Sequence, residues 1–250
     1  MSIERDYHAD RAGVEVSGAA EASGEVTQRV TDGRYAFVRV KVELDVRVQF
    51  HEEGETPNGF NIIAELPGTD PKLKEEVVIY SAHWDHLGKQ GESGDTIYNG
   101  AVDNGSGTAG LLAMAQAAMR APAKRSQMFL WVAAEEQGLL GSAAYASSPL
   151  WPLAKTAANL NLDSLNWIGA ARDIGTKGSE RTELGAMAEA TAKAMGLTVS
   201  KPTPDLAGGY FRSDHFSFAK AGVPAFSISG GTDYIKDPEA AKAKQKTYAP

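Results

Sequence analysis

Apolar and polar residues alternate along the first part of the chain. From Tyr35 to Phe50 almost every second residue is apolar, and charged or polar residues stand between most of them. This period of two predicts one long, half-buried strand. The next segment, His51–Gly59, is polar and contains Pro and Gly, so it predicts a hairpin loop. Asn61–Leu66 predicts a second strand, which stops at Pro67.

Beyond residue 70 the pattern changes to short apolar runs that alternate with segments of helical character. The predicted strands are Val77–Ser81, Gln127–Ala133, Ala157–Leu162 and Pro224–Ile228. The predicted helices are Thr108–Arg120, Gly141–Ser147, Glu180–Met195 with Gly196 as its C-cap, and Ser213–Ala221. Strands that alternate with helices predict an α/β fold, a three-layer sandwich with a mostly parallel central sheet flanked by helices.

The N-terminal part of the chain has a different character. Residues 1–34 show little apolar periodicity and are rich in Gly, Ala and Glu. We expect them to form a loosely ordered lead-in or the remnant of a neighbouring domain, ahead of a main domain that spans residues 35–250. The first ten residues are charged and lack the apolar stretch of a secretory signal, which leaves the compartment open.

Composition narrows the classes of function. Hydrophobic residues make up 42% and charged residues 23% of the 250 residues, which excludes a largely disordered chain. The chain has 25 Lys and Arg against 32 Asp and Glu, a formal net charge of −7, and no basic run. Phosphate contacts need clustered Lys and Arg, and a bilayer span needs about 18 apolar residues. We therefore expect neither nucleic acid nor a membrane as a partner.

The absence of cysteine excludes disulfides, thiolate metal sites and cysteine nucleophiles. Any metal site must therefore combine carboxylates with the few histidines that the chain contains. These are His8, His51, His83, His86 and His215.

Acids or histidine follow three of the predicted strands. His83 and Asp85 follow the first, Glu135 and Glu136 follow the second, and Asp163 follows the third. In open α/β sheets, functional groups collect beyond the carboxyl ends of the strands. We therefore expect these side chains to share one site.

Each of these residues also has a purely structural interpretation. His83 can present one ring nitrogen to a metal while Asp85 hydrogen-bonds the other and sets the tautomer, or both can belong to an ordinary polar loop. Asp103 lies in a Gly-rich turn before a helix, where it can bridge two cations or cap the helix. Burying the charges of Glu135 and Glu136 costs free energy unless cations or protons compensate them. The structural alternative is a solvated acidic loop, which needs no such compensation.

The order of five motifs resembles the co-catalytic di-zinc aminopeptidase family, which includes bacterial leucine aminopeptidases and glutamate carboxypeptidase. The motifs are Ser81–His86 (SAHWDH), Gly100–Gly107 (GAVDNGSG), Ala134–Ser142 (AEEQGLLGS), Asn161–Asp163 (NLD) and Ser213–Phe218 (SDHFSF). The resemblance implies a zinc-dependent exopeptidase that removes N-terminal residues from peptides and binds two Zn²⁺ ions. Members of this family are often secreted or periplasmic.

The resemblance also implies a role for each site residue. His83 and Asp163 correspond to ligands of one zinc ion, Asp103 to the bridging carboxylate and Glu136 to a ligand of the second ion. Glu135 corresponds to the general base. Asp85 corresponds to the acid behind His83, while Tyr210 and Phe211 are candidates for the pocket that binds the substrate side chain.

The chain departs from the family pattern in one respect. The family has a fifth ligand, a histidine near the C-terminus, and no histidine follows His215 here. One interpretation is that the chain is truncated just before this ligand. Another is that His215 substitutes for it, and a third is that the second site is weak or empty. We expect His86 to lie behind the site or at the surface and Asp214 to cap or orient its helix.

Other activities fit the same chemistry. A carboxypeptidase or dipeptidase needs a basic group for the substrate carboxylate, and Arg212 is a candidate. A truncated or inactive zinc-binding homologue and a one-zinc glutaminyl cyclase are further alternatives.

Overall fold

The computed structural model describes residues 26–31, 35–40, 59–201 and 205–247 of the chain. The strands are β1 (Val26–Thr31), β2 (Tyr35–Val40), β3 (Gly59–Leu66), β4 (Val77–His83), β5 (Gly88–Lys89), β6 (Ile97–Tyr98), β7 (Ser126–Val132), β8 (Thr156–Leu162), β9 (Asp173–Lys177), β10 (Thr198–Val199) and β11 (Ala225–Gly230). The α-helices are α1 (Gly105–Arg120), α2 (Leu140–Ser147), α3 (Leu184–Ala194), α4 (His215–Lys220) and α5 (Pro238–Thr247).

A nine-stranded sheet forms the centre of the molecule, with strand order β1-β2-β3-β7-β4-β8-β11-β9-β10. The four central strands β7, β4, β8 and β11 run parallel to one another. Antiparallel pairs join β3 to β7 and β9 to β11 at the two borders of this parallel block. The prediction of a mostly parallel sheet is confirmed, and it places the carboxyl ends of β4, β7 and β8 at one edge.

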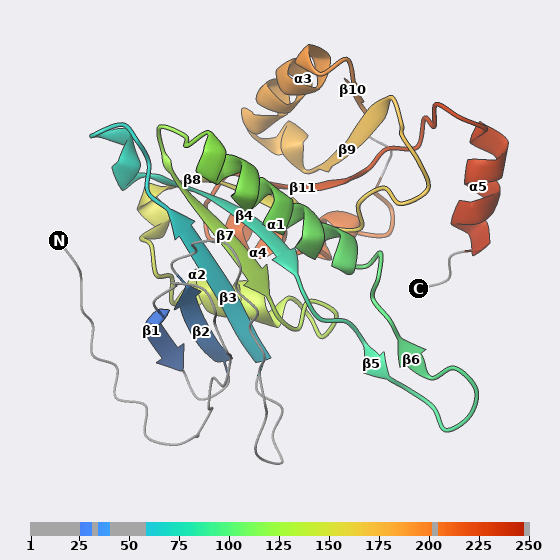
Figure 1. Ribbon diagram of the computed structural model, residues 1–250, viewed down its shortest axis with the longest axis horizontal. Helices are drawn as coiled ribbons and strands as arrows, with labels where there is room; N and C mark the ends of the chain where they lie inside the picture. Colours follow the sequence, from blue (N-terminus) through green and yellow to red (C-terminus); the bar gives the residue numbers. More distant parts are fainter. Residues whose placement is uncertain (1–25, 32–34, 41–58, 202–204, 248–250) are drawn as a thin grey trace.

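Helices cover both faces of the sheet, as Figure 1 shows for α1 in front and α2 and α4 behind. On the α1 face, Leu111 packs with Phe129 and Trp131 in one apolar cluster. On the opposite face, Tyr145 of α2 and Phe218 of α4 pack in a second cluster. Successive residues of a buried strand point to opposite faces, so β4 and β7 contribute to both clusters. The predicted three-layer sandwich is confirmed.

Helix α1 starts at a well-defined cap. The Asn104 side chain accepts a hydrogen bond from the backbone N–H of Gly107 at 3.0 Å, which satisfies one of the free donors of the first turn. A Cβ atom at Gly107 would lie 2.3 Å from Asn104 Oδ1 and 2.6 Å from the carbonyl oxygen of Leu162. Glycine therefore allows the first turn of α1 to approach the end of β8 closely.

The N-terminal predictions need correction. β2 covers the first part of the predicted strand Tyr35–Phe50, and residues 41–58 lie outside the described residues. β2 and β3 pair in parallel, whereas the two strands of a hairpin are antiparallel. The predicted hairpin loop at His51–Gly59 lies, except for Gly59, outside the described residues. β1 lies within the predicted lead-in and pairs with β2.

Later predictions of elements agree with the structure except at some boundaries. The predicted helix Glu180–Met195 is interrupted, because Ser179–Arg181 forms a 3-10 turn and Thr182 adopts an extended backbone. The Thr182 hydroxyl then accepts the backbone N–H of Leu184, where α3 begins. Strands β9 and β10 carry little apolar periodicity and were not expected. No helix within the described ranges is long and apolar enough to cross a membrane.

Candidate metal centre and active site

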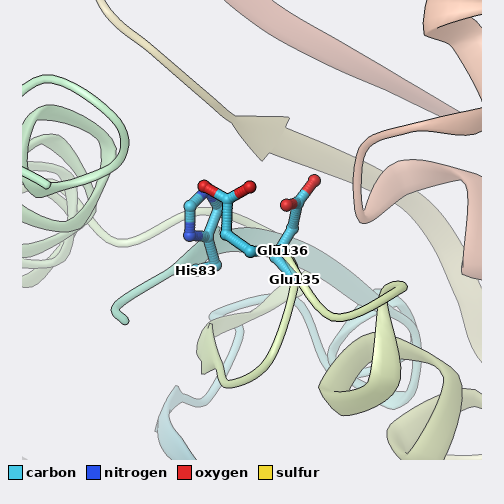
Figure 2. A group of neighbouring side chains, drawn as sticks. All are labelled: His83, Glu135 and Glu136. Carbon is cyan, nitrogen blue, oxygen red and sulfur yellow. The ribbon is translucent and has the colours of Figure 1, made fainter. Parts of the chain in front are cut away.

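The predicted site residues lie close together, at the ends of β4, β7 and β8 and in the turn before α1. His83 Nε2 lies 3.0 Å from Asp103 Oδ1 and 3.6 Å from Asp163 Oδ1. His83 also lies with Glu135 and Glu136, with one potential ligand atom of each residue within 4.8 Å of the others. The three side chains project into the same space beyond the strand ends, as Figure 2 shows. The expectation that these residues share one site agrees with this geometry.

The ring of His83 is held in one orientation. Its Nδ1 atom lies 2.9 Å from the backbone carbonyl oxygen of Asp85, an acceptor that requires a proton on Nδ1. Nε2 is then the nitrogen that can bind a metal ion when the ring is neutral. Asp85 thus orients His83 through its backbone and not, as we expected, through its carboxylate. The Asp85 carboxylate accepts the backbone N–H of Ala134 at 2.7 Å and anchors the loop after β7.

Asn104 links the turn that carries Asp103 to the end of β8. Its amide nitrogen donates to the carbonyl oxygen of Leu162 at 2.8 Å, and its amide oxygen accepts the backbone N–H of Ser164 at 3.2 Å. Asn104 is almost completely buried, so these bonds are shielded from water. They fix Asp103 relative to Asp163, which lies between Leu162 and Ser164. Sequence reasoning identified Asp103 but missed the role of the next residue.

A chain of buried hydrogen bonds orients Asp163. The hydroxyl of Ser213 donates to Asp163 Oδ2 at 2.7 Å and accepts from Asn161 Nδ2 at 2.8 Å. Asn161 in turn accepts from the hydroxyl of Ser81 at 2.8 Å. Ser81 and Asn161 stand between apolar residues in the buried strands β4 and β8, and that unusual pattern is the signal that could have identified them.

Glu135 and Glu136 occupy a tight turn after β7. Ala134, just before them, has a left-handed φ of 57°, and Ser164, just after Asp163, has a φ of 54°. This conformation costs a non-glycine residue about 1–2 kcal/mol, and such strain clusters at functional sites. The backbone N–H groups of Gly138 and Leu139 both donate to the Glu135 carbonyl and close the turn.

The acids of the site lie close enough to repel one another. Burial raises the pKa of Glu135 to about 9, and the neighbouring charge of Asp214 adds to the effect. Burial likewise raises the pKa of Asp214 to about 7. Burial disfavours a protonated His83, but Asp103 and Asp163 outweigh it and raise the pKa of that imidazole to about 11. Protons thus compensate negative charge that a bound cation would otherwise neutralise.

The donor set fits a divalent metal ion. Several buried polar atoms have no hydrogen-bond partner among the described residues, although they lie close together. They are His83 Nε2, Asp103 Oδ1, His86 Nδ1 and Glu136 Oε1. Buried polar atoms without a hydrogen-bond partner are rare in folded proteins, and nitrogen and carboxylate donors of this kind suit zinc. This part of the chain is therefore suited to hold a cation at His83, Asp103 and Asp163.

His86 lies inside the site, contrary to our expectation of a place behind it or at the surface. Its Nδ1 atom is 2.6 Å from Glu136 Oε1, and the two residues form a further potential metal-binding group with Asp103. Its position three residues after His83 was visible in the sequence. The sequence alone did not reveal that the chain turns back after β4 toward Glu136.

His215 is not brought into any of the potential metal-binding groups found in the described part of the chain. It lies beside the ring of Tyr210, with the ring centroids 5.0 Å apart. Burial lowers the pKa of His215 to about 4, so the ring is neutral. Asp214 is completely buried, and its charge lies near enough to Glu135 to raise the pKa of the Glu135 carboxyl group. The suggestion that His215 replaces a missing ligand gains no support from this placement.

A cleft of about 540 Å³ opens beside the acids of this site. The residues that line it include Asp103, Glu135, Glu136 and Asp163, together with Phe211, as expected for a pocket residue. Tyr210 instead packs behind Phe211, with the ring centroids 5.2 Å apart. The cleft also contains two cationic side chains, Lys177 and Arg212. Lys177 comes from β9, a strand that the sequence did not reveal.

Known proteins resemble this chain over most of the described region. Leupeptin-inactivating enzyme 1 of Streptomyces exfoliatus is 35% identical over 191 residues, which is 75% of this chain and 39% of that protein. Leucine aminopeptidase 1 of Trichophyton rubrum is 30% identical over 188 residues, which is 71% of this chain and 49% of that protein. The chain thus spans less than half the length of both relatives.

Solved structures show the same fold. A zinc aminopeptidase from Bacillus subtilis matches with a TM-score of 0.54 and 26% identity, covering 72% of this chain and 43% of that one. A glutaminyl cyclase from an Acidobacteriales bacterium matches with a TM-score of 0.53 and 26% identity, covering 70% of this chain and 59% of that one. Residues 61–248 match the model of peptidase family M28, and the chain therefore belongs to that family.

Proposed function

We propose that this protein is a zinc-dependent aminopeptidase that hydrolyses the first peptide bond of a peptide substrate. The observation that carries the proposal is the convergence of His83 Nε2 on Asp103 and Asp163 beside Glu135. Leucine aminopeptidases among the relatives, and a zinc aminopeptidase among the similar structures, support the choice of activity and metal.

His83, Asp103 and Asp163 would hold one zinc ion, and Asp103 and Glu136 would contribute to a second site. When bound, zinc polarises the peptide carbonyl and lowers the pKa of a water molecule. The protein's own contribution is to present neutral Nε2 through the bond from Nδ1 to the Asp85 carbonyl. Ser213 and Asn104 keep the carboxylate of Asp163 and the turn of Asp103 in place.

Glu135 is the proposed general base. Its side chain lines the cleft and groups with His83 and Glu136, which places it within reach of a water molecule above the strand ends. The carboxylate accepts a proton from the attacking water and returns it to the amine that leaves. Its high pKa in the metal-free protein reflects burial and nearby acids, so cation binding lowers that pKa toward the range a base needs.

Hydrolysis of leucine p-nitroanilide by the chain with added Zn²⁺ tests the proposal. Glu135→Gln keeps the shape of the side chain and removes the base, so turnover should fall by about 10²–10⁴-fold while bound zinc is retained. Glu189→Gln on the exposed surface of α3 is the matched control. The proposal fails if the zinc-loaded protein is inert toward anilides and free peptides, or if Glu135→Gln has normal turnover.

A second candidate is a carboxypeptidase or dipeptidase, and one observation favours it. Lys177 and Arg212 line the same cleft as the acids, and a cation there can pair with the free carboxylate of a substrate. Peptides blocked at the N-terminus and peptides blocked at the C-terminus separate the two activities. Cleavage of only the N-blocked peptide, lost in Arg212→Gln, would replace the aminopeptidase assignment with this one.

A further inference from the structure

The aminopeptidase chemistry proposed above gives no role to His86. This histidine nevertheless makes a very close contact with Glu136 in the site. His86 Nδ1 lies 2.6 Å from Glu136 Oε1, and the His86 side chain is 10% exposed. Asp103, His86 and Glu136 each offer an atom within 4.8 Å of the others. This group shares Asp103 with the His83 group but draws its nitrogen from a different histidine.

The contact is too close for two unrelated atoms, yet it is not a hydrogen bond. Both His86 Nδ1 and Glu136 Oε1 are buried and lack a hydrogen-bond partner among the described residues. An N–H group has to point at its acceptor for a hydrogen bond to form, and here it does not. His83 Nε2 and Asp103 Oδ1 show the same off-axis relationship at 3.0 Å. Donor atoms that share a cation converge on a common point instead of on one another.

The position of the His86 ring is built into the surrounding chain. Gly100, with a φ of 61°, has room for no side chain, because a Cβ atom there would lie 2.9 Å from His86 Cβ. The Gly100 carbonyl accepts the backbone N–H of Gly105 at 2.7 Å, which ties this turn to the start of α1. The ring of Tyr98 lies edge-on to the imidazole, with the centroids 6.1 Å apart. The backbone and an aromatic ring thus hold His86 against the site.

We propose that His86 is the nitrogen ligand of a second divalent cation, which Asp103 and Glu136 bind with it. The proposal rests on the metal chemistry of the proposed function and adds a ligand to it. One imidazole and two carboxylates form a donor set that suits Zn²⁺ or Co²⁺ and is poor for Ca²⁺ or Mg²⁺, which prefer oxygen ligands throughout. Asp103 belongs to both potential metal-binding groups, so the two cations would share its carboxylate.

Zinc stoichiometry of the full 250-residue chain tests the proposal directly. The metal-free protein is titrated with Zn²⁺ alone by calorimetry, and bound metal is counted after dialysis. We expect about two equivalents for the parent chain and about one for His86→Phe, which keeps a ring against Tyr98 but offers no ligand. The affinity of the remaining site should change little. His215→Phe is the matched control, since it removes another buried histidine that lies in none of the metal-binding groups.

Imidazole ¹⁵N NMR of the same samples separates a ligand from an ion-pair partner. On addition of Zn²⁺ the Nδ1 resonance of His86 should shift and lose its proton signal. In His86→Ala, free imidazole should restore the second equivalent, which keeps the test valid if the Phe variant folds poorly. Loss of a partner that only orients a ligand costs about 10–100-fold in affinity, so a larger loss is expected here.

Three outcomes would overturn the proposal. They are two equivalents of zinc in His86→Phe with unchanged affinities, loss of the second equivalent in His215→Phe instead, and a His86 Nδ1 that stays protonated in the zinc-loaded protein. Failure of the proposed function looks different. In that case the parent chain binds no zinc, or binds it and remains inert toward peptides with the His86 resonance shifted as expected.

Discussion

The side-chain amide of Asn104 donates a hydrogen bond of 2.8 Å to the backbone carbonyl of Leu162, across 58 residues of sequence. The same amide caps α1 through Gly107 and accepts the N–H of Ser164. A single buried side chain therefore joins the turn that carries Asp103 to the strand end that carries Asp163. The spacing of these two carboxylates around His83 depends on this connection.

Asn104→Ala should lower the free energy of unfolding by about 1–3 kcal/mol, because it removes the helix cap and leaves buried backbone groups without partners. Zinc affinity should also fall, since Asp103 is no longer held beside Asp163. Urea unfolding and zinc titration measure the two effects. Asn99→Ala, at an exposed position, is the control and should stay within about 0.5 kcal/mol of the parent. Equal stability of the two variants would contradict the assigned role.

Gly107→Ala should destabilise the protein by about 1–3 kcal/mol or more, because the new methyl group meets the backbone oxygen of Leu162 and the side chain of Asn104. Gly169→Ala is the matched control, since a Cβ atom there meets nothing within 4 Å. Thermal unfolding of the two variants checks the difference. A normal melting temperature for Gly107→Ala would mean that α1 does not approach β8 as closely as described.

Ser213→Ala should weaken zinc binding by about 10–100-fold, the usual effect of losing a partner that orients a metal ligand. Asp163 loses a hydrogen-bond donor, and the Asn161 amide loses an acceptor that lies 2.8 Å away. The pKa of Asp163, which burial raises and which His83 and Ser213 lower, should rise in the variant. Zinc titration and carboxyl ¹³C NMR measure these changes, with the exposed Ser147→Ala as control. Unchanged affinity would show that Asp163 needs no such support.

The metal-free protein should lose stability as the pH rises from about 5 to about 9. The pKa of Glu135 is raised from 4.5 to about 9. The contribution of its protonation to folding stability is therefore complete below pH 4.5 and is lost as the pH rises through 9. The pKa of His83 is raised from 6.5 to about 11, so its contribution lasts below 6.5 and disappears as the pH passes 11. Loss of either proton therefore lowers the free energy of unfolding as the pH rises. Urea unfolding at several pH values checks the trend, and Glu135→Gln should flatten it.

Zinc binding reverses this protonation. The ion requires neutral His83, so binding near pH 8 should release at least one proton. Calorimetric titrations in buffers of different ionisation enthalpy measure the number released. Binding heats that do not depend on the buffer would contradict the assignment of His83 Nε2 as a ligand.

The sequence by itself determined much of the α/β core and the residues that carry the chemistry. The strands β4, β7 and β8 are predicted within a residue or two of their observed bounds, because strands buried on both faces are rich in apolar residues. His83, Glu135, Glu136 and Asp163 follow those runs directly. Their meeting at one edge follows from the parallel arrangement, which the alternation of strands and helices predicts.

Tertiary structure decided the rest, because the deciding contacts join residues that are distant along the chain and have no local pattern. Ser213 contacts Asn161 across 52 residues, and β9 becomes a strand only through its antiparallel pairing with β11. His86 turns toward Glu136 because Gly100 leaves room for its ring. A local sequence pattern reports the period and burial of one segment, whereas the direction of a loop side chain depends on which other segments surround it.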